Sequence, residues 1–318
     1  PSGRKVLPPE GYCWRLSKEK FKEFVKDNRI WFGKDGNNVP SIKRFLTEVK
    51  QSITPMTIWK YSEVGHSQDA KQNLKKLFDG KSFFDYPKSV ELIKRCIQLY
   101  SNESSIIIDF FSGSATTAHA VMQLNAEDGG KRKFIMVQLP EKTDEKSEAF
   151  KAGYKNICEI GKERIRRAGE KIKEEAGLNG QDLDIGFRVL KLDSSNMKDI
   201  YYSADEYDQG MLENMQSNTK EDRTDLDLLF GCLVDWGLEL DKPYTIKKIN
   251  GHKVHIYNDG DLVACFEKDL DMKTIDEIAK LQALRVVFSD NSFVDSATKI
   301  NVAEHFKMIA PDSDIKVI

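Results

Sequence analysis

Cysteine is scarce and scattered in this chain of 318 residues. The five cysteines are far apart, with no Cys-x-x-Cys pair and no Cys/His cluster at zinc spacing. This pattern excludes a disulfide framework and a structural zinc site, and it predicts reduced thiols in a cytoplasmic protein. No apolar run approaches the roughly 18 residues of a membrane helix, and no signal peptide is recognisable. We therefore expect no membrane partner.

An excess of one charge is also lacking, since 49 Lys and Arg face 51 Asp and Glu. The balance is uneven along the chain, however: residues 1–100 carry 20 basic and 11 acidic residues, a formal charge of +9, and the remainder carries −11. A basic half favours a polyanionic partner, although a basic surface is also common without one. Aromatic and basic residues alternate there, as in nucleic-acid interfaces, but a small core with a solvated rim explains them equally. These candidates are Trp31, Lys34, Lys43, Arg44, Trp59 and Tyr61.

Short connections separate alternating helices and strands in the middle of the chain. The stretch "YPKSVELIKRCIQLY" predicts a helix that follows Ser89, and Ile106 to Asp109 predicts a strand. A helix from about Ala115 to Leu124 and a second strand, "KFIMVQL", closing on Pro140 and Glu141, come next. This order is typical of a βαβ unit in a parallel, doubly wound α/β sheet.

Small and polar residues follow the first predicted strand in "SSIIIDFFSGSATTAHAV". Ligands of such sheets bind at the carboxyl ends of the strands, so Asp109 is placed to accept hydrogen bonds from a ligand. Gly113 permits close approach of the backbone, and Thr116 and Thr117 begin the next helix. Glu141, at the end of the second strand, is predicted to hold ribose hydroxyls. Together these positions indicate a nucleoside cofactor.

Glycine is too sparse here for a dinucleotide. The Gly-x-Gly-x-x-Gly fingerprint exposes backbone amides to a pyrophosphate, and only Gly113 is present. A cofactor without phosphate fits better, and S-adenosylmethionine is the common one. A nicotinamide-dependent oxidoreductase remains the less favoured alternative.

Several other segments yield structural predictions. Residues 153–176 predict a long helix with Ile157, Ile160, Ile165, Ala168 and Ile172 inward, residues 191–225 predict a polar linker or arm, and a hairpin turns at 258–260. His119 is interpreted as a packed or rim histidine rather than a catalyst. No nucleophile elbow is visible, which argues against a hydrolase triad. No metal site is visible either.

These motifs resemble a known family. "DFFSGSATT" is similar to the cofactor loop of amino-methylating DNA methyltransferases, and "YPKS" and "RKFIMVQLPE" are similar to their flanking motifs, in the order of the beta class. "NRIWFGKDG", "WKYSEVGHS", "GGKRKFIMVQLPE" and "FVDSATKINVAEHF" resemble the modification (Mod) subunit of prokaryotic type III restriction-modification systems. The resemblance covers essentially the whole chain.

The resemblance implies an S-adenosylmethionine pocket and an activity on adenine N6 of double-stranded DNA. Its implied cofactor-binding residues are Lys88, Ser89, Asp109, Phe110, Phe111, Ser112, Gly113, Ser114, Thr116, Thr117 and Glu141. Ala115 and Ser89 depart from the family, which often has glycine and proline at these positions. The implied partners are a second Mod subunit and the restriction (Res) helicase-nuclease subunit.

A [DNS]-Pro-Pro-[aromatic] tetrapeptide, which grips the flipped adenine in this family, is missing. "LPPEGY" at 7–12 has two prolines but neither the acceptor nor the aromatic residue. No catalytic residue is therefore assigned, and the chain is interpreted as the C-terminal part of a longer enzyme, inactive alone. We expect part of a target-recognition region at 1–80, a partial Rossmann-like methyltransferase region at 81–190 and a smaller α+β assembly domain at 191–318. The alternative is a DNA-binding or assembly subunit with a vestigial pocket.

Overall fold

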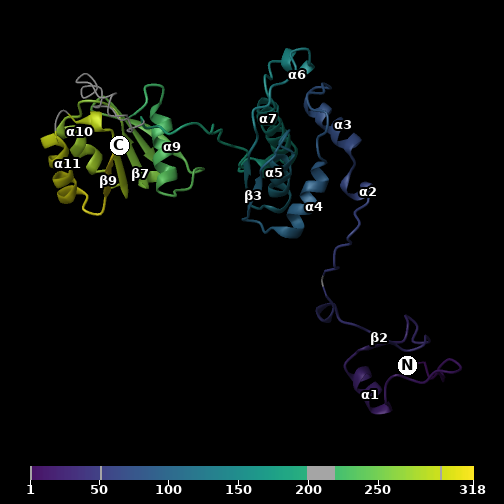
Figure 1. Ribbon diagram of the computed structural model, residues 1–318. Coiled ribbons are helices and arrows are strands. Elements are labelled where there is room, and N and C mark those ends of the chain that lie inside the picture. Colours follow the sequence, from purple (N-terminus) through teal and green to yellow (C-terminus); the bar gives the residue numbers. More distant parts are fainter. Residues whose placement is uncertain (1, 51, 199–218, 294–295) are drawn as a thin grey trace, which may run out of the picture. The chain divides into compact units, whose positions relative to one another are not determined.

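The computed structural model describes residues 2–50, 52–198, 219–293 and 296–318 (Figure 1). The chain divides into two units, Pro1–Ile185 and Gly186–Ile318, which are considered separately. The predicted polar arm at 191–225 falls partly on residues 199–218, which lie outside the described residues. No helix of the described residues is both long enough and apolar enough to cross a membrane.

Short elements form the start of the first unit. Helix α1 (Lys18–Lys26) begins after Ser17, whose side chain accepts a hydrogen bond from the Lys20 amide. Strands β1 (Ile30–Trp31) and β2 (Ser41–Ile42) pair in antiparallel fashion, and the 3-10 turn η1 (Leu46–Glu48) follows. No residue of α1 is buried, so its apolar face makes little core.

The first unit contains a parallel two-stranded sheet. Helix α4 (Val90–Tyr100) leads into β3 (Ile106–Asp109), and α5 (Thr116–Asp128) connects β3 to β4 (Lys133–Met136). Ile106 lies opposite Lys133 and Asp109 opposite Met136 in parallel register. The predicted helix–strand–helix–strand unit with parallel strands is therefore confirmed.

Helices cover one face of this sheet. Ile107 and Phe134 pack against a cluster of Ile97, Ala120, Val121 and Leu124 from α4 and α5. Side chains alternate between the faces of a strand, so the neighbouring positions point the other way. Those positions are apolar and about half exposed or more within the described residues: Ile106, Ile108, Ile135, Val137 and Leu139.

A second group of helices packs together in this unit. Helix α2 (Tyr61–Val64) precedes α3 (Ser67–Leu77), and α6 (Glu148–Lys151) precedes the long helix α7 (Ile157–Ala176), which ends in the 3-10 turn η2 (Gly177–Gly180). Leu74, Phe78, Ala149 and Ile160 form the small core that joins α3, α6 and α7. Helix α7 matches the predicted helix, with Ile160, Ile165, Ala168 and Ile172 buried.

A five-stranded mixed sheet forms the second unit, in the order β5-β6-β7-β8-β9. The β5–β6 and β6–β7 pairs are antiparallel and the β7–β8 and β8–β9 pairs are parallel. The predicted hairpin corresponds to β6 and β7, joined by the 3-10 turn η4. The strands are β5 (Tyr244–Ile249), β6 (His252–Tyr257), β7 (Leu262–Cys265), β8 (Arg285–Phe288) and β9 (Asp314–Val317), with η4 at Asn258–Gly260.

Both faces of this second sheet are covered. Val263 and Cys265 contact a core that includes residues of α10 (Met272–Ala279) and α11 (Ser296–Ile309). Leu262 and Ala264 point to the opposite face and contact α9 (Asp225–Asp235). The 3-10 turn η5 (Asp290–Ser292) follows β8. The sheet of the second unit is therefore covered on both faces, whereas the β3–β4 sheet of the first unit is covered on one.

Candidate cofactor site

The loop between β3 and α5 is tied together by one carboxylate. Asp109 Oδ1 accepts a hydrogen bond from the Phe111 amide at 3.1 Å, and Asp109 Oδ2 accepts one from the Thr117 hydroxyl at 2.6 Å. Strand β3 ends at Asp109 and α5 begins at Thr116, so the carboxylate links the two elements that the loop connects. A carboxylate has about four acceptor sites, which leaves capacity for a ligand.

Two residues of this loop, Gly113 (φ 50°) and Ala115 (φ 58°), have a left-handed backbone. A Cβ added to Gly113 would lie 3.3 Å from the Phe84 ring, so glycine also permits a close contact there. Ala115 is the N-cap residue of α5 and has a left-handed conformation that residues with a Cβ adopt at a cost. From the sequence, Ala115 differs from the family's glycine by one methyl group, whereas the structure shows that it also has a strained backbone.

The predicted cofactor residues divide into a buried and an exposed set. Ser114, Thr116 and Thr117 are buried behind the loop. Phe110 and Phe111 are 68% and 87% exposed, so their rings are available to a ligand. Ser112 donates its amide to the Val137 carbonyl at 3.1 Å. Lys88 is exposed, and Ser89 is the N-cap residue of α4 without a capping hydrogen bond from its side chain.

Glu141 does not end the second strand, which corrects the sequence prediction. Strand β4 ends at Met136, and its backbone pairing continues only as far as Val137, whose amide donates to the Asp109 carbonyl at 2.8 Å and whose carbonyl accepts from the Ser112 amide. Glu141 follows in a loop, where its carbonyl accepts from the Ile157 amide and its side chain is exposed. Pro140 has no amide hydrogen, so it could not have extended the pairing as far as Glu141 in any case.

Gln138 instead lies beside the loop at the end of β4, a position that the sequence prediction missed. Its Oε1 accepts a hydrogen bond from the Gly113 amide at 2.7 Å. The only signal in the sequence was a polar residue within the apolar run "KFIMVQL". Arg164 of α7 was missed as well, although it follows Ile160 and precedes Ala168 on the buried stripe at a spacing of four.

His119 of α5 is a packed histidine, as predicted. Burial, and then the charges of Arg164, Lys171 and Lys94, lower its pKa to about 3. The ring is therefore neutral at physiological pH. Its Nδ1 is buried and has no hydrogen-bond partner in the described part of the chain. His119 and Arg164 both line a small hollow of about 30 Å³, which has room for a water molecule.

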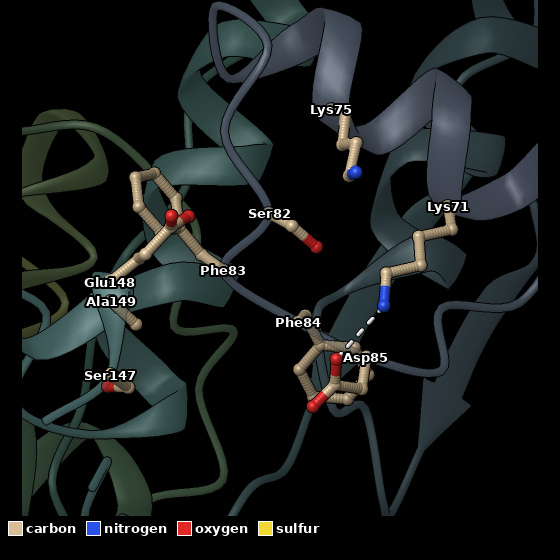
Figure 2. A pocket seen from close by; sticks show the side chains of 9 residues that line it. All are labelled: Lys71, Lys75, Ser82, Phe83, Phe84, Asp85, Ser147, Glu148 and Ala149. Atoms are coloured by element: carbon tan, nitrogen blue, oxygen red, sulfur yellow. Dashed lines mark hydrogen bonds and ion pairs between the residues drawn. The ribbon is translucent and has the colours of Figure 1, made fainter.

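A larger hollow of about 320 Å³ lies between α3, residues 82–85 and α6 (Figure 2). Lys71 pairs with Asp85 across it at 3.0 Å, and Lys75 and Ser82 line the same space. Phe84 lines this hollow and also lies near the loop, since its ring would be 3.3 Å from a Cβ placed on Gly113. Asp109 and Glu141 line neither of these two hollows.

The three aromatic candidates of the N-terminal hundred, Trp31, Trp59 and Tyr61, each lie near a basic side chain or a histidine. Lys43 Nζ lies 6.0 Å from the Trp31 ring centroid, and Tyr61 stacks on His66 at 5.8 Å. Trp59 lies 5.9 Å from the Arg95 guanidinium. Such pairs suit either an ordinary surface or a nucleic-acid interface, so their role in DNA binding stays a prediction. Among the described residues, no group of three His, Cys, Asp or Glu could hold a metal.

A parallel βαβ unit with a glycine-containing loop at its carboxyl edge is a ligand-binding architecture of α/β proteins. Residues 4–170, more than half of the chain, match the DNA methylase family. The chain belongs to the DNA methylase family.

Type III Mod subunits are among the relatives of this chain. It is 36% identical to the StyLTI Mod subunit of Salmonella typhimurium over 188 residues, which cover 58% of this chain and 28% of that protein. It is 28% identical to the EcoP15I Mod subunit of Escherichia coli over 319 residues, which cover 98% of this chain and 46% of that protein. The type II methyltransferase M.KpnI of Klebsiella pneumoniae is 33% identical over 148 residues, which cover 46% of this chain and 34% of that protein. The matches confirm the predicted resemblance, and the chain spans less than half the length of these relatives.

Proposed function

We propose that this chain is the cofactor-binding part of an adenine-N6 DNA methyltransferase of the type III Mod kind, acting on double-stranded DNA. The single observation that carries the proposal is the loop closed by Asp109 at the carboxyl end of a parallel strand, in a chain of the DNA methylase family. S-adenosylmethionine is the proposed cofactor, and it would supply an electrophilic methyl group on its sulfonium.

The residues present fit that cofactor. Asp109 has acceptor capacity left for an ammonium or hydroxyl group, and Phe110 and Phe111 offer exposed rings to the adenine or the methionine chain. Glu141 is an exposed carboxylate suited to ribose hydroxyls. In this proposal Lys88 and Ser89 approach from the start of α4, and the backbone of Ser112, Gly113 and Ser114 surrounds the cofactor.

The role of these residues is to hold and orient, because transfer to an exocyclic amine depends mainly on in-line placement of the reacting groups. The tetrapeptide that would grip a flipped adenine is not in the sequence, so we propose that another segment of a longer polypeptide supplies it. The exposed apolar face of the β3–β4 sheet supports this view, because a parallel sheet is normally covered on both faces. A second Mod subunit, the Res subunit and DNA are the proposed partners, and unit Gly186–Ile318 is proposed to serve assembly.

Calorimetric titration with S-adenosylmethionine tests the cofactor assignment. Phe111→Ala should weaken binding about tenfold or more, because stacking on an exposed ring is worth about 1–3 kcal/mol. Tyr100→Ala is the matched control, since Tyr100 is 86% exposed on α4 and is not among the proposed cofactor residues. Equal affinity of the Phe111 and Tyr100 variants would contradict the placement. No heat of binding in the intact polypeptide would favour the assembly subunit instead.

A further inference from the structure

Arg164 is a buried cation without a buried counter-charge. Its side chain is 3% exposed on α7, and no carboxylate of the described residues lies within ion-pair distance of it. Burial lowers its pKa to about 10, so the guanidinium stays protonated at neutral pH. An uncompensated buried charge destabilises a fold, and even buried ion pairs can often be replaced by apolar residues of similar volume without loss of stability. Stability alone therefore does not account for arginine at this position.

The hydrogen bonds of Arg164 go to the loop that follows β3. Nη1 donates to Ser114 Oγ at 2.8 Å and to Thr116 Oγ1 at 2.7 Å, with a longer contact of 3.4 Å to the Ser114 carbonyl. Ser114 and Thr116 flank Ala115, the loop residue other than glycine that has a left-handed backbone. One guanidinium nitrogen thus holds both neighbours of the strained residue.

Helix α7 also approaches the loop through Gly161, three residues before Arg164. A Cβ at Gly161 would lie 3.4 Å from the Gly113 carbonyl oxygen and 3.5 Å from Ala115 Cβ. The small residue brings the helix backbone close to the loop, and Arg164 supplies the donors over the same surface. The contacts span about fifty positions in the sequence, so they hold two distant segments together.

We propose that Arg164 is a positioning residue, which fixes the loop 110–117 in its binding conformation from behind. The cofactor part of this inference rests on the proposed function, but the loop part does not. Arg164 contacts the loop through the hydroxyls of Ser114 and Thr116. Without these hydrogen bonds the backbone at Ala115 would relax out of its left-handed conformation, and this role explains why a buried charge is kept at position 164. The hydroxyls of Ser114 and Thr116 then serve the cofactor indirectly, because they face Arg164 and hold the loop backbone in place.

Amide hydrogen exchange of the whole chain without cofactor tests the loop part. Arg164→Met should accelerate exchange in peptides covering 110–117 by about tenfold or more, since one or two hydrogen bonds to a charged donor are lost. The melting temperature should stay equal or rise. Arg167→Met is the matched control, because Arg167 lies on the same helix and instead pairs with Asp79 and Glu163. Exchange within twofold of the wild type in Arg164→Met would overturn the proposal, as would equal acceleration by Arg167→Met.

Two further variants guard against a folding defect. Thr116→Val removes one acceptor at constant shape and should give a smaller acceleration of the same peptides. Adding it to Arg164→Met should produce no further change, because both act on one hydrogen bond. Additive effects would argue against the proposal.

The affinity for S-adenosylhomocysteine, measured on the intact polypeptide, tests the cofactor part. It should fall about tenfold in Arg164→Met, recover in part in Arg164→Lys, and stay unchanged in Arg167→Met. If the wild type does not bind this ligand, the proposed function fails while the exchange result still decides the role of Arg164.

Discussion

The Gly113 amide and the Gln138 side-chain oxygen are joined by a hydrogen bond of 2.7 Å across the carboxyl ends of β3 and β4. Gly113 is the glycine of the predicted cofactor loop, and Gln138 lies two residues beyond the last residue of the neighbouring strand. The loop is thus held by a residue that follows β4 and by a residue of α7.

Replacing Gln138 should loosen this loop. Gln138→Leu keeps the approximate volume but removes the acceptor, which leaves the Gly113 amide unsatisfied at a cost of about 1 kcal/mol. We expect the affinity for S-adenosylhomocysteine to fall about fivefold, measured by calorimetry on the intact polypeptide. Gln123→Leu on α5, which lies away from the loop, serves as the control. An unchanged affinity in Gln138→Leu would show that the hydrogen bond has no part in binding.

Ala115 should tolerate glycine but not a branched side chain. Ala115→Gly relieves the strain of the left-handed backbone. The loss of the methyl contacts and the greater freedom of the unfolded chain offset that gain, so the free energy of unfolding should change by less than about 1 kcal/mol. Ala115→Val should lower it by about 2–3 kcal/mol, because a β-branched residue is strongly disfavoured at positive φ and would crowd Gly161. Urea unfolding of both variants measures the difference. Equal losses in the two would contradict the left-handed backbone.

His119 should make the first unit less stable in mild acid. Its pKa is about 6.5 in the unfolded chain and about 3 in the folded one, because burial and then Arg164, Lys171 and Lys94 disfavour the charged ring. The unfolded state therefore binds the proton first as pH falls. The contribution of the neutral His119 ring to the free energy of unfolding is fully present above about pH 6.5 and is lost progressively toward pH 3. About 1–2 kcal/mol is lost between pH 7 and pH 5.

The variant His119→Gln isolates this effect from the titration of the acidic residues. The wild type should lose more free energy of unfolding between pH 7 and pH 5 than the variant does, as followed by amide exchange of α5 at both pH values. If the wild type and His119→Gln show the same pH dependence, the ring is already accessible to protons in the folded state.

The apolar face of the β3–β4 sheet should accept charge in this chain when it is alone. Ile108 and Ile135 lie opposite each other in the register and are 50% and 48% exposed. The double variant Ile108→Lys with Ile135→Glu places opposite charges side by side, so we expect unchanged thermal stability and less self-association in sedimentation velocity. Ile107→Lys, directed at the helix-covered face, should unfold the unit. If the double variant unfolds it as well, that face is covered in solution.

Sequence periodicity predicted the local elements well where the signal was strong. Helix α7 could be predicted because its apolar residues recur along one face, and the parallel strands could be predicted because apolar segments alternate with helices at short spacing. The end of β4 could not be predicted, since apolar residues continue past Met136 although the chain leaves the sheet there. Helix α1 has a clear apolar stripe, yet none of its residues is buried, because periodicity does not say whether a partner surface is present.

The sequence by itself determined the order of the elements, the loop from Asp109 to Thr117, and the family, because these depend on residues that are close together along the chain. Only the tertiary structure decided which side chains hold that loop. Gln138 and Arg164 reach it from positions 25 and 50 residues away from their partners Gly113 and Ser114. Strand register brings the first residue to the loop and helix packing brings the second, and neither relationship is encoded in local spacing.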